Sequence, residues 1–366
     1  MRIKVKTNEL TKAVVNVGKV ISGKSIDLIL ENVLLKINNK ISFTTTNLEQ
    51  AMEYFIEGEI LDNTGITETV LPYDLLRDIT PKFKSDEVEM DISSKKVTIK
   101  DDDGEFTLHT LNPEAFAVIP EVISNLMFSL PLSTFRSLID NTIFDASKKE
   151  ESRKEFKGIF FDIKDGFVNL VATDSTSLAL NKFSFNLESP TNFIVPFKAL
   201  DVLSHISLDE GNVDVIVSDS SIKFSLPNLS LISLLINGTF PQYESVIPEG
   251  SEFYATIAKK PLMDALDIIE VFARRGTGRI VFTFSDGNVT IESSSTSIGG
   301  GKKTIPCETN ANVSLQFLGE KIIEGIEHVQ DDRVSLKIQG PLHPVLVKGE
   351  SSDNYIYVIM PQRPVE

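Results

Sequence analysis

One order of elements occurs three times along the chain, and this repeat constrains the fold more than any other feature. Each copy begins with apolar residues spaced three or four apart, which is the pattern of an amphipathic helix with one buried stripe. The three stripes start at Leu10, Phe135 and Leu262. In the second copy, Ser133 is of the type expected at a helix N-cap.

A β-hairpin signature follows each of these predicted helices. Two apolar or alternating runs surround a pair of residues that accept positive φ at low cost, as tight hairpin turns require. The three pairs are Asn38-Asn39, Asp165-Gly166 and Asp286-Gly287. Because the pairs occupy the same place in each copy, we predict three equivalent hairpins.

A second helix is predicted further along each copy. Pro72 and Pro196 precede two of these helices, where a proline opens a helix without losing a needed hydrogen bond, and Leu318 stands there in the third copy. The landmarks keep their order and nearly their spacing. The alternative is chance similarity among ordinary amphipathic segments.

The repeat predicts three α+β domains of one topology, at residues 1–125, 126–248 and 249–366. Each domain would hold two helices and two small antiparallel sheets. Domains joined edge to edge would bury strand edges that otherwise invite aggregation. The two free ends of such an arc would be satisfied if two chains paired head to tail in a ring.

The charge of the chain argues against nucleic-acid binding when it is taken alone. Asp and Glu number 52 and Lys and Arg 36, for a net charge of −16. Many basic residues nevertheless fall on the predicted helices, whereas acidic residues concentrate in strands and turns. We therefore hypothesise a mildly basic inner surface within an acidic shell, which would contact phosphates without reading bases. The alternative is that these residues are ordinary solvated helix faces.

Motifs for catalysis or metal binding are sparse. The four histidines lack metal-ligand spacing, and a lone Cys307 cannot form an intramolecular disulfide. The acidic run 101–105 is expected to be a hairpin turn, and the glycine-rich run 299–304 lacks the spacing of a phosphate loop. We expect no enzymatic activity, no cofactor and no metal, in a cytoplasmic protein without a signal peptide or membrane span. A hydrolase with carboxylates hidden among the acidic turns is the competing hypothesis.

Four segments resemble the bacterial sliding clamp, the β subunit of DNA polymerase III, and the resemblance extends over the whole chain. They are Arg153 with Gly158, VATDSTSLAL from Val171, FPQYESVIP from Phe240 and YVIMPQR from Tyr357. The resemblance implies a homodimeric, head-to-tail ring of clamp domains that encircles duplex DNA and acts as a processivity factor. The implied partners are duplex DNA without sequence preference, the DNA polymerase III catalytic subunit, the clamp loader, repair polymerases and mismatch-repair proteins.

The resemblance also implies three sets of site residues. A partner-peptide pocket between the second and third domains would be lined by Arg153, Phe156, Thr173, Leu178, Pro241, Val246, Val358, Met360 and Pro361. The dimer interface would use Phe106, Leu108, Val271 and Phe272, and the residues facing DNA would be Lys24, Lys149, Arg153 and Lys198.

Two departures from the family bear on the pocket. Residues 175–177 are Ser-Thr-Ser, where members usually have Gly-His-Arg, and residues 364–366 extend past the usual terminus. Plain packing is the alternative role for Thr173, Leu178, Pro241 and Phe272. A peptide-binding scaffold that does not encircle DNA is the alternative function.

Overall fold

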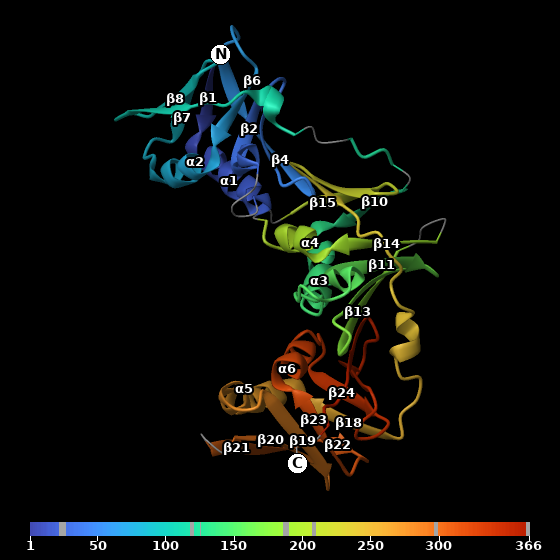
Figure 1. Ribbon diagram of the computed structural model, residues 1–366. Helices are drawn as coiled ribbons and strands as arrows, with labels where there is room; N and C mark the ends of the chain where they lie inside the picture. The colour runs from blue at the N-terminus through green and yellow to red at the C-terminus, as the bar shows by residue number, and fades with distance from the viewer. Residues whose placement is uncertain are drawn as a thin grey trace. The chain divides into compact units, whose positions relative to one another are not determined.

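The structure is a computed structural model that describes residues 1–21, 27–117, 121–124, 126–185, 190–206, 210–295 and 299–363. It divides into two compact units, one of residues 1–135 and 198–235 and the other of residues 136–197 and 236–366, and each is described by itself. The helices in the described ranges, labelled in Figure 1, are α1 (Thr7–Val17), α2 (Tyr73–Ile79), α3 (Leu132–Ile143), α4 (Phe197–Ser204), α5 (Lys259–Arg275) and α6 (Gly319–Glu327).

The first unit contains two antiparallel sheets. A five-stranded sheet has the order β5 (Gly58–Asp62), β1 (Arg2–Lys6), β7 (Glu87–Ile92), β8 (Lys96–Lys100) and β9 (Glu105–His109). An eight-stranded sheet has the order β10 (Leu126–Pro131), β15 (Asn212–Val217), β16 (Ser221–Leu226), β17 (Leu229–Leu234), β4 (Gln50–Ile56), β3 (Ile41–Thr46), β2 (Asn32–Ile37) and β6 (Glu68–Pro72).

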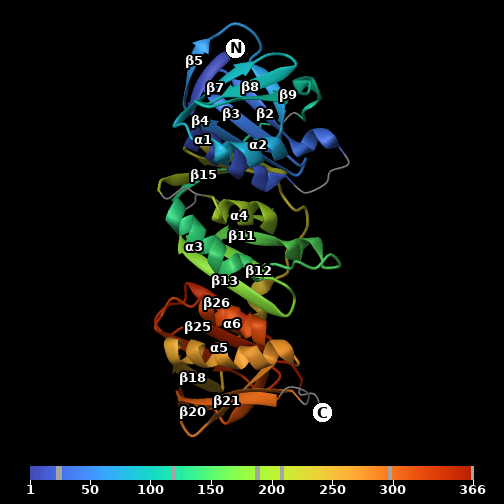
Figure 2. The same ribbon diagram turned by 90° about the vertical axis from the view of Figure 1, so that its left-hand side faces the viewer.

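The second unit is built in the same way. A nine-stranded sheet has the order β14 (Thr191–Pro196), β11 (Gly158–Lys164), β12 (Phe167–Thr173), β13 (Ser177–Ser184), β26 (Tyr355–Ile359), β25 (Val345–Gly349), β24 (Arg333–Ile338), β18 (Phe253–Ala258) and β22 (Glu308–Thr309). A four-stranded sheet has the order β21 (Gly299–Pro306), β20 (Asn288–Ser295), β19 (Arg279–Ser285) and β23 (Val313–Leu318). Helices α5 and α6 lie side by side in this unit (Figure 2).

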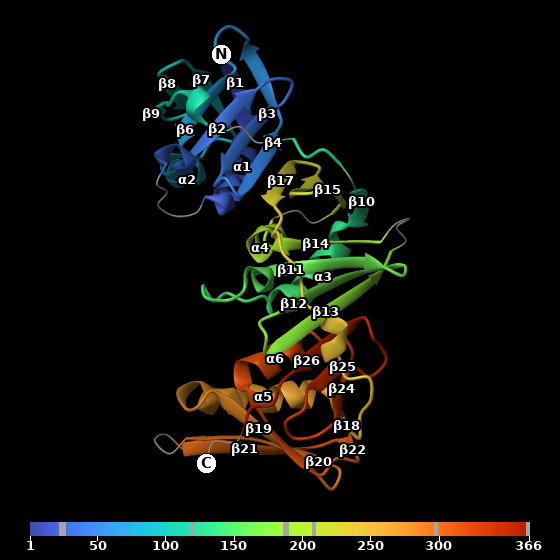
Figure 3. The ribbon, with the colours of Figure 1, turned by 45° about the vertical axis from the view of Figure 1, so that its right-hand side comes forward.

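The strand pairings repeat three times, as the sequence predicts. The strand that opens each repeat pairs with the strand that follows its second helix, in β1–β7, β10–β15 and β18–β24. Repeats also join edge to edge within each unit: β17 pairs with β4, and β13 pairs with β26 (Figure 3). The predicted fold of α+β repeats with antiparallel sheets is confirmed.

The hairpin prediction is confirmed in two copies and wrong in one detail of the first. Asp165 and Gly166 have φ of 53° and 79°, and Asp286 and Gly287 have 49° and 74°, so both pairs form the expected two-residue turns. In the first copy Ile37 pairs with Ile41 across a three-residue loop. Neither asparagine of that loop is among the described residues with positive φ. The extra residue removes the need for the tight turn.

The helices begin directly where a strand ends. Pro72 and Leu318 are the N-cap residues of α2 and α6, and neither makes a side-chain cap hydrogen bond. The prediction of Ser133 as an N-cap is wrong, because α3 begins one residue earlier, at Leu132. The strand β10 ends at Pro131, so the chain passes straight from strand to helix.

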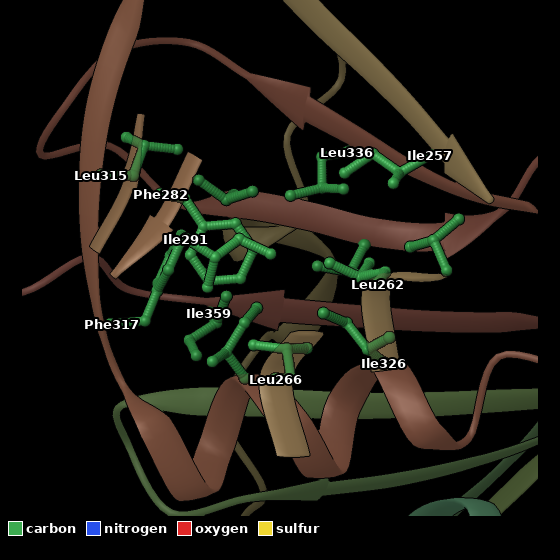
Figure 4. Packing of buried hydrophobic residues seen from close by; sticks show 14 of the residues in the cluster. Ile257, Leu262, Leu266, Phe282, Ile291, Leu315, Phe317, Ile326, Leu336 and Ile359 are labelled. Atoms are coloured by element: carbon green, nitrogen blue, oxygen red, sulfur yellow. The ribbon is translucent and has the colours of Figure 1, made fainter. Parts of the chain in front are cut away.

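The predicted helix stripes form the cores. Leu10, Phe135, Leu262 and Leu266 are all buried. In the third repeat, Leu266 of α5 and Ile326 of α6 pack with Phe282 and Phe317 of the sheets (Figure 4). Burial of apolar surface at about 25 cal/mol per Å² makes this packing the main source of the repeat's stability.

Candidate peptide-binding pocket

A cavity of about 740 Å³ lies in the second unit, where β13 of one repeat pairs with β26 of the next. Its walls are the turn between β12 and β13, the 3₁₀ helix Tyr243–Val246, the loop between β24 and β25, and the end of β26. Seven of the nine residues predicted for a partner pocket line it: Phe156, Thr173, Leu178, Pro241, Val246, Val358 and Met360.

The floor of the cavity is apolar and buried. Leu178 and Val358 face each other across the β13–β26 ladder. The ring of Phe240 stacks on the ring of Phe160, with 4.7 Å between centroids. It lies nearly perpendicular to the ring of Phe156, with 6.4 Å between centroids. A concave apolar site with a few polar groups at its rim suits an extended peptide with apolar side chains.

Two apolar side chains at the rim are left partly in solvent. Val246 is 46% exposed and Met360 is 38% exposed. Both line the cavity, so a ligand would remove further apolar surface from water there.

Side chains of β11 hold the wall formed by residues 243–246 in place. The Tyr243 hydroxyl donates a hydrogen bond of 2.7 Å to Asp162 Oδ2, and Lys164 Nζ lies 2.8 Å from the same oxygen. Lys164 also pairs with Glu244. Burial, together with the Asp162 carboxylate, raises the pKa of Tyr243, so the phenol stays neutral and donates.

The opposite wall is the turn between β12 and β13, which is closed by the Asp174 side chain. Asp174 Oδ1 accepts hydrogen bonds from the backbone N–H groups of Thr176 at 2.9 Å and Ser177 at 3.1 Å. Ser175, which follows Asp174 in the turn, has φ of 79°, a conformation that costs a non-glycine residue about 1 kcal/mol or more. The turn therefore depends on its hydrogen bonds to hold this shape.

A buried ion cluster stands behind this turn. Lys321 Nζ lies 2.9 Å from Asp145 Oδ1 and 3.1 Å from Asp174 Oδ2. The Asp145 side chain is fully buried, and Ser177 Oγ donates to Asp145 Oδ1 at 2.5 Å. Asp145 Oδ2 has no hydrogen-bond partner among the described residues.

The pKa values of the two carboxyl groups are pushed apart. Burial raises the pKa of Asp145 to about 7, against the opposing effect of Lys321 and Ser177. Burial also acts on Asp174, but the hydrogen bonds from Thr176 and the charge of Lys321 lower its pKa to about 2. Burial opposes the charge on Lys321, and the two carboxylates outweigh it and raise its pKa.

Two predicted pocket residues do not line the cavity in the described structure. Arg153 is exposed at the N-cap of the 3₁₀ helix Lys154–Lys157, and Pro361 is buried just after Met360. Two lining residues were not predicted, namely Gln339 and Pro344, which reach the cavity from the β24–β25 loop. No motif in the sequence marks that loop, whereas Tyr243 and Glu244 lie inside the FPQYESVIP segment and could have been found.

The four predicted interface residues lie on a strand and a helix of different units. Phe106 is 39% exposed on the edge strand β9, and Val271 is 52% exposed on α5. Phe272 is half-buried. Leu108, the fourth of these residues, offers no exposed apolar side chain in the single chain. Leu108 is the one buried residue of β9, because its side chain faces the core of its own domain.

The structure describes three of the four residues predicted to face DNA. Lys24 lies outside the described residues. Lys149, Arg153 and Lys198 are exposed. Several other basic residues of the helices pair with carboxylates of the same helix, namely Lys12 with Glu9, Arg77 with Asp74, Lys260 with Asp264 and Arg274 with Glu270. These pairs leave the helices less basic than their lysines and arginines alone suggest.

The acidic run has the structure that the sequence predicts, and the glycine-rich run lies in a strand. Residues 101–104 connect β8 to β9 as a hairpin turn, and 299–306 form β21. Within the described ranges, no three His, Cys, Asp or Glu side chains are grouped so that they could hold a metal ion. None of the helices described in the structure is long and apolar enough to span a membrane.

Comparison with known proteins places the three repeats in one family. The family models of the DNA polymerase III beta subunit match along the chain: the N-terminal domain at residues 1–120, the central domain at 129–242 and the C-terminal domain at 244–363. The beta sliding clamp of Chlamydia pneumoniae is 25% identical and covers 99% of both chains. That of Staphylococcus epidermidis is 29% identical over 89% of each chain.

Solved structures of this family share the fold. The DNA polymerase III subunit beta of Pseudomonas aeruginosa has a TM-score of 0.93 at 24% identity, over all of both chains. A sliding clamp from the same organism bound to griselimycin has a TM-score of 0.92. The chain therefore belongs to the family of the DNA polymerase III beta subunit, the bacterial sliding clamps, and its function is that of a processivity factor in DNA replication.

Proposed function

We propose that two copies of this chain close head to tail into a ring around duplex DNA. The observation that carries this proposal is the way the repeats join within the chain. The last strand of the second repeat, β17, pairs with β4 of the first, and the last strand of the third, β26, pairs with β13 of the second. The corresponding strands at the two ends of the chain are β9, the last strand of the first repeat, and β21 of the third repeat. Both are edge strands of their sheets.

In the proposed dimer, β9 of one protomer pairs with β21 of the other. Both strands are largely exposed in the single chain, and both are edge strands of their sheets. β9 carries Glu105 and follows the acidic turn 101–103, whereas β21 carries Lys302 and Lys303. Opposite charges on the two edges favour this pairing and disfavour pairing of like edges.

The ring would hold DNA by topology rather than by strong contact. Lys149, Arg153 and Lys198 are candidate phosphate contacts, and Lys24 stays a prediction. Because many helix cations already pair with neighbouring carboxylates, direct attraction to DNA is expected to be weak. A ring linked to DNA by topology can stay on the duplex without strong contacts and remain free to slide.

The cavity at the β13–β26 junction is proposed to receive a short peptide from the polymerase. Its buried apolar floor and its exposed Val246 and Met360 suit apolar anchor residues. We propose the same pocket for the clamp loader, repair polymerases and mismatch-repair proteins, in a non-enzymatic protein of the cytoplasm. The proposed domains are residues 1–125, 126–248 and 249–366, with the second boundary in the connection between β17 and β18.

The oligomeric state tests the proposed ring. Val271→Asp or Phe106→Asp should convert the dimer to monomers in multi-angle light scattering, because each places a carboxylate on a surface that the dimer would bury. Met127→Asp is the matched control, since Met127 is 60% exposed on β10 and is outside the proposed interface. A dimer that survives both interface substitutions would overturn the assigned interface.

A further inference from the structure

The turn that forms one wall of the pocket has a counterpart in the first repeat. In the first repeat Asn47 Oδ1 accepts the backbone N–H groups of Glu49 at 3.0 Å and Gln50 at 2.8 Å, as Asp174 Oδ1 does in the second. The residue after each side chain has positive φ, 73° at Leu48 and 79° at Ser175. A neutral amide can therefore close this turn, so its closure does not by itself require the charge of Asp174.

The two turns are anchored to different parts of the fold. Asn47 Nδ2 donates a hydrogen bond of 3.1 Å to the carbonyl of Val20, at the end of the first helical segment of its own repeat. Asp174 uses its second oxygen, Oδ2, to contact Lys321, which lies on α6 of the following repeat. The wall of the pocket in the second repeat is thus held by a side chain from the third.

Lys321 makes this link through a second carboxylate as well. Asp145 contacts the ammonium group through Oδ1, and the same oxygen accepts the Ser177 hydroxyl at the other end of the turn. The Lys321 side chain is only 19% exposed. Removing its charge would leave Asp174 Oδ2 and the buried Asp145 carboxyl group without the cation they share. The turn would then keep only its own hydrogen bonds and the bond from Ser177 to Asp145.

We propose that Lys321 is a positioning residue of the peptide pocket, which fixes the turn 174–177 in its binding shape by holding Asp174 and Asp145 together. This inference rests on the proposed peptide-binding function of the cavity. Lys321 does not line the cavity. It acts through the turn, and it makes the pocket wall depend on the docking of the third repeat against the second.

The test compares Lys321→Met with Lys321→Arg in the full-length protein. Peptide affinity is measured with a synthetic peptide from the polymerase, and amide exchange of the segment 173–178 is followed by mass spectrometry. In Lys321→Met the amides of Thr176 and Ser177 should exchange at least tenfold faster. The dissociation constant should rise about tenfold if the turn adopts its binding shape about one tenth of the time. The arginine variant keeps the charge and should recover most of both effects.

Lys259→Met is the matched control. Lys259 also anchors α6, because its Nζ donates to the carbonyl of Glu327 at 2.8 Å, but it contacts neither carboxylate of the cluster. It should leave exchange at 173–178 unchanged. Unaltered exchange and affinity in Lys321→Met, or equal losses in Lys321→Met and Lys259→Met, would overturn the proposal. A third outcome is that exchange is faster in Lys321→Met but the wild-type protein binds no peptide. This outcome would reject the peptide-binding function and leave the role of Lys321 in the turn intact.

Discussion

Leu178 and Val358 lie directly opposite each other in the antiparallel ladder of β13 and β26, although 180 residues of sequence separate them. One comes from the second repeat and the other from the third. The floor of the pocket therefore exists only where two repeats share a sheet. The equivalent pair in the first unit is Ala51 and Ile232, in the ladder of β4 and β17.

The rim of the pocket can be altered without disturbing the core. Val246→Asp and Met360→Asp replace side chains that are partly exposed in the free protein, so the fold should persist. Each should weaken binding of a polymerase-derived peptide by tenfold or more, because a carboxylate would be buried against apolar groups. Isothermal titration calorimetry checks this.

Leu234→Asp is the control for the pocket variants. Leu234 is 46% exposed and is the last residue of β17, the final strand of the second repeat. It is the counterpart of Met360, which follows β26, the final strand of the third repeat. Its substitution should leave peptide affinity within twofold of the wild type. An equal loss in the control and the pocket variants would show that the effect does not arise in the pocket.

Asp145 gives the stability of the second unit a dependence on pH. Burial raises the pKa of Asp145 from 3.8 to about 7 in the folded state, so the folded protein binds this proton more tightly than the unfolded chain does. This contribution is greatest below about pH 4 and is lost as pH rises towards 7. The charged groups that face Asp145 are Lys321 and Asp174, and both remain ionised across this range.

Asp145→Asn should remove this dependence. The melting temperature of the variant relative to the wild type should increase between pH 4 and pH 8, by an amount equivalent to a few kcal/mol at most. Differential scanning fluorimetry at matched ionic strength measures the difference. A difference that is the same at every pH would contradict the raised pKa.

Gly325 lets α6 approach β26 closely. A Cβ atom at Gly325 would lie 2.1 Å from the ring of Tyr357, which is fully buried. Gly325→Ala should therefore destabilise the protein by roughly 1–3 kcal/mol despite the better helix propensity of alanine. Gly250→Ala has open space around its Cβ and should change the free energy of unfolding by less than about 1 kcal/mol in chemical denaturation. Equal stability of the two variants would contradict this close packing.

Direct contact with DNA should be weak, dependent on salt and indifferent to sequence. Affinity for a short linear duplex should fall steeply between about 50 and 200 mM salt, because lysines and arginines bind phosphates by releasing counterions. Two unrelated duplexes of the same length should bind equally in fluorescence anisotropy. A clear preference for one of them would argue against backbone contact alone.

The repeats, the helices and most of the hairpins could be predicted from sequence because they depend on the pattern of residues close together in the chain. The spacing of Leu262 and Leu266 and the pair Asp286-Gly287 act over a few residues. The burial of Leu108 next to a partly exposed Phe106 could not be predicted, since the two side chains lie on the same face of β9. The alternation does not say how far along the strand that face is covered, and tertiary packing decides it.

The pocket was predictable only in part for the same reason. The predicted residues lie in recognisable motifs, whereas Gln339 and Pro344 lie in a loop that carries no motif. The ion cluster was missed because Asp145, Asp174 and Lys321 are distant in sequence and meet only when two repeats share a sheet. A lysine in an amphipathic helix normally indicates a solvated face, and here it is mostly buried.

Retention on circular DNA tests whether the protein encircles the duplex. The protein is loaded onto a nicked circular duplex by an active clamp loader and washed in high salt, and the circle is then cut. A closed ring should stay on the circle through the wash and slide off after linearisation, because salt removes electrostatic contact but not topological linkage. Loss from the circle during the wash, with a loader that retains a control clamp, would contradict encirclement and favour a peptide-binding scaffold.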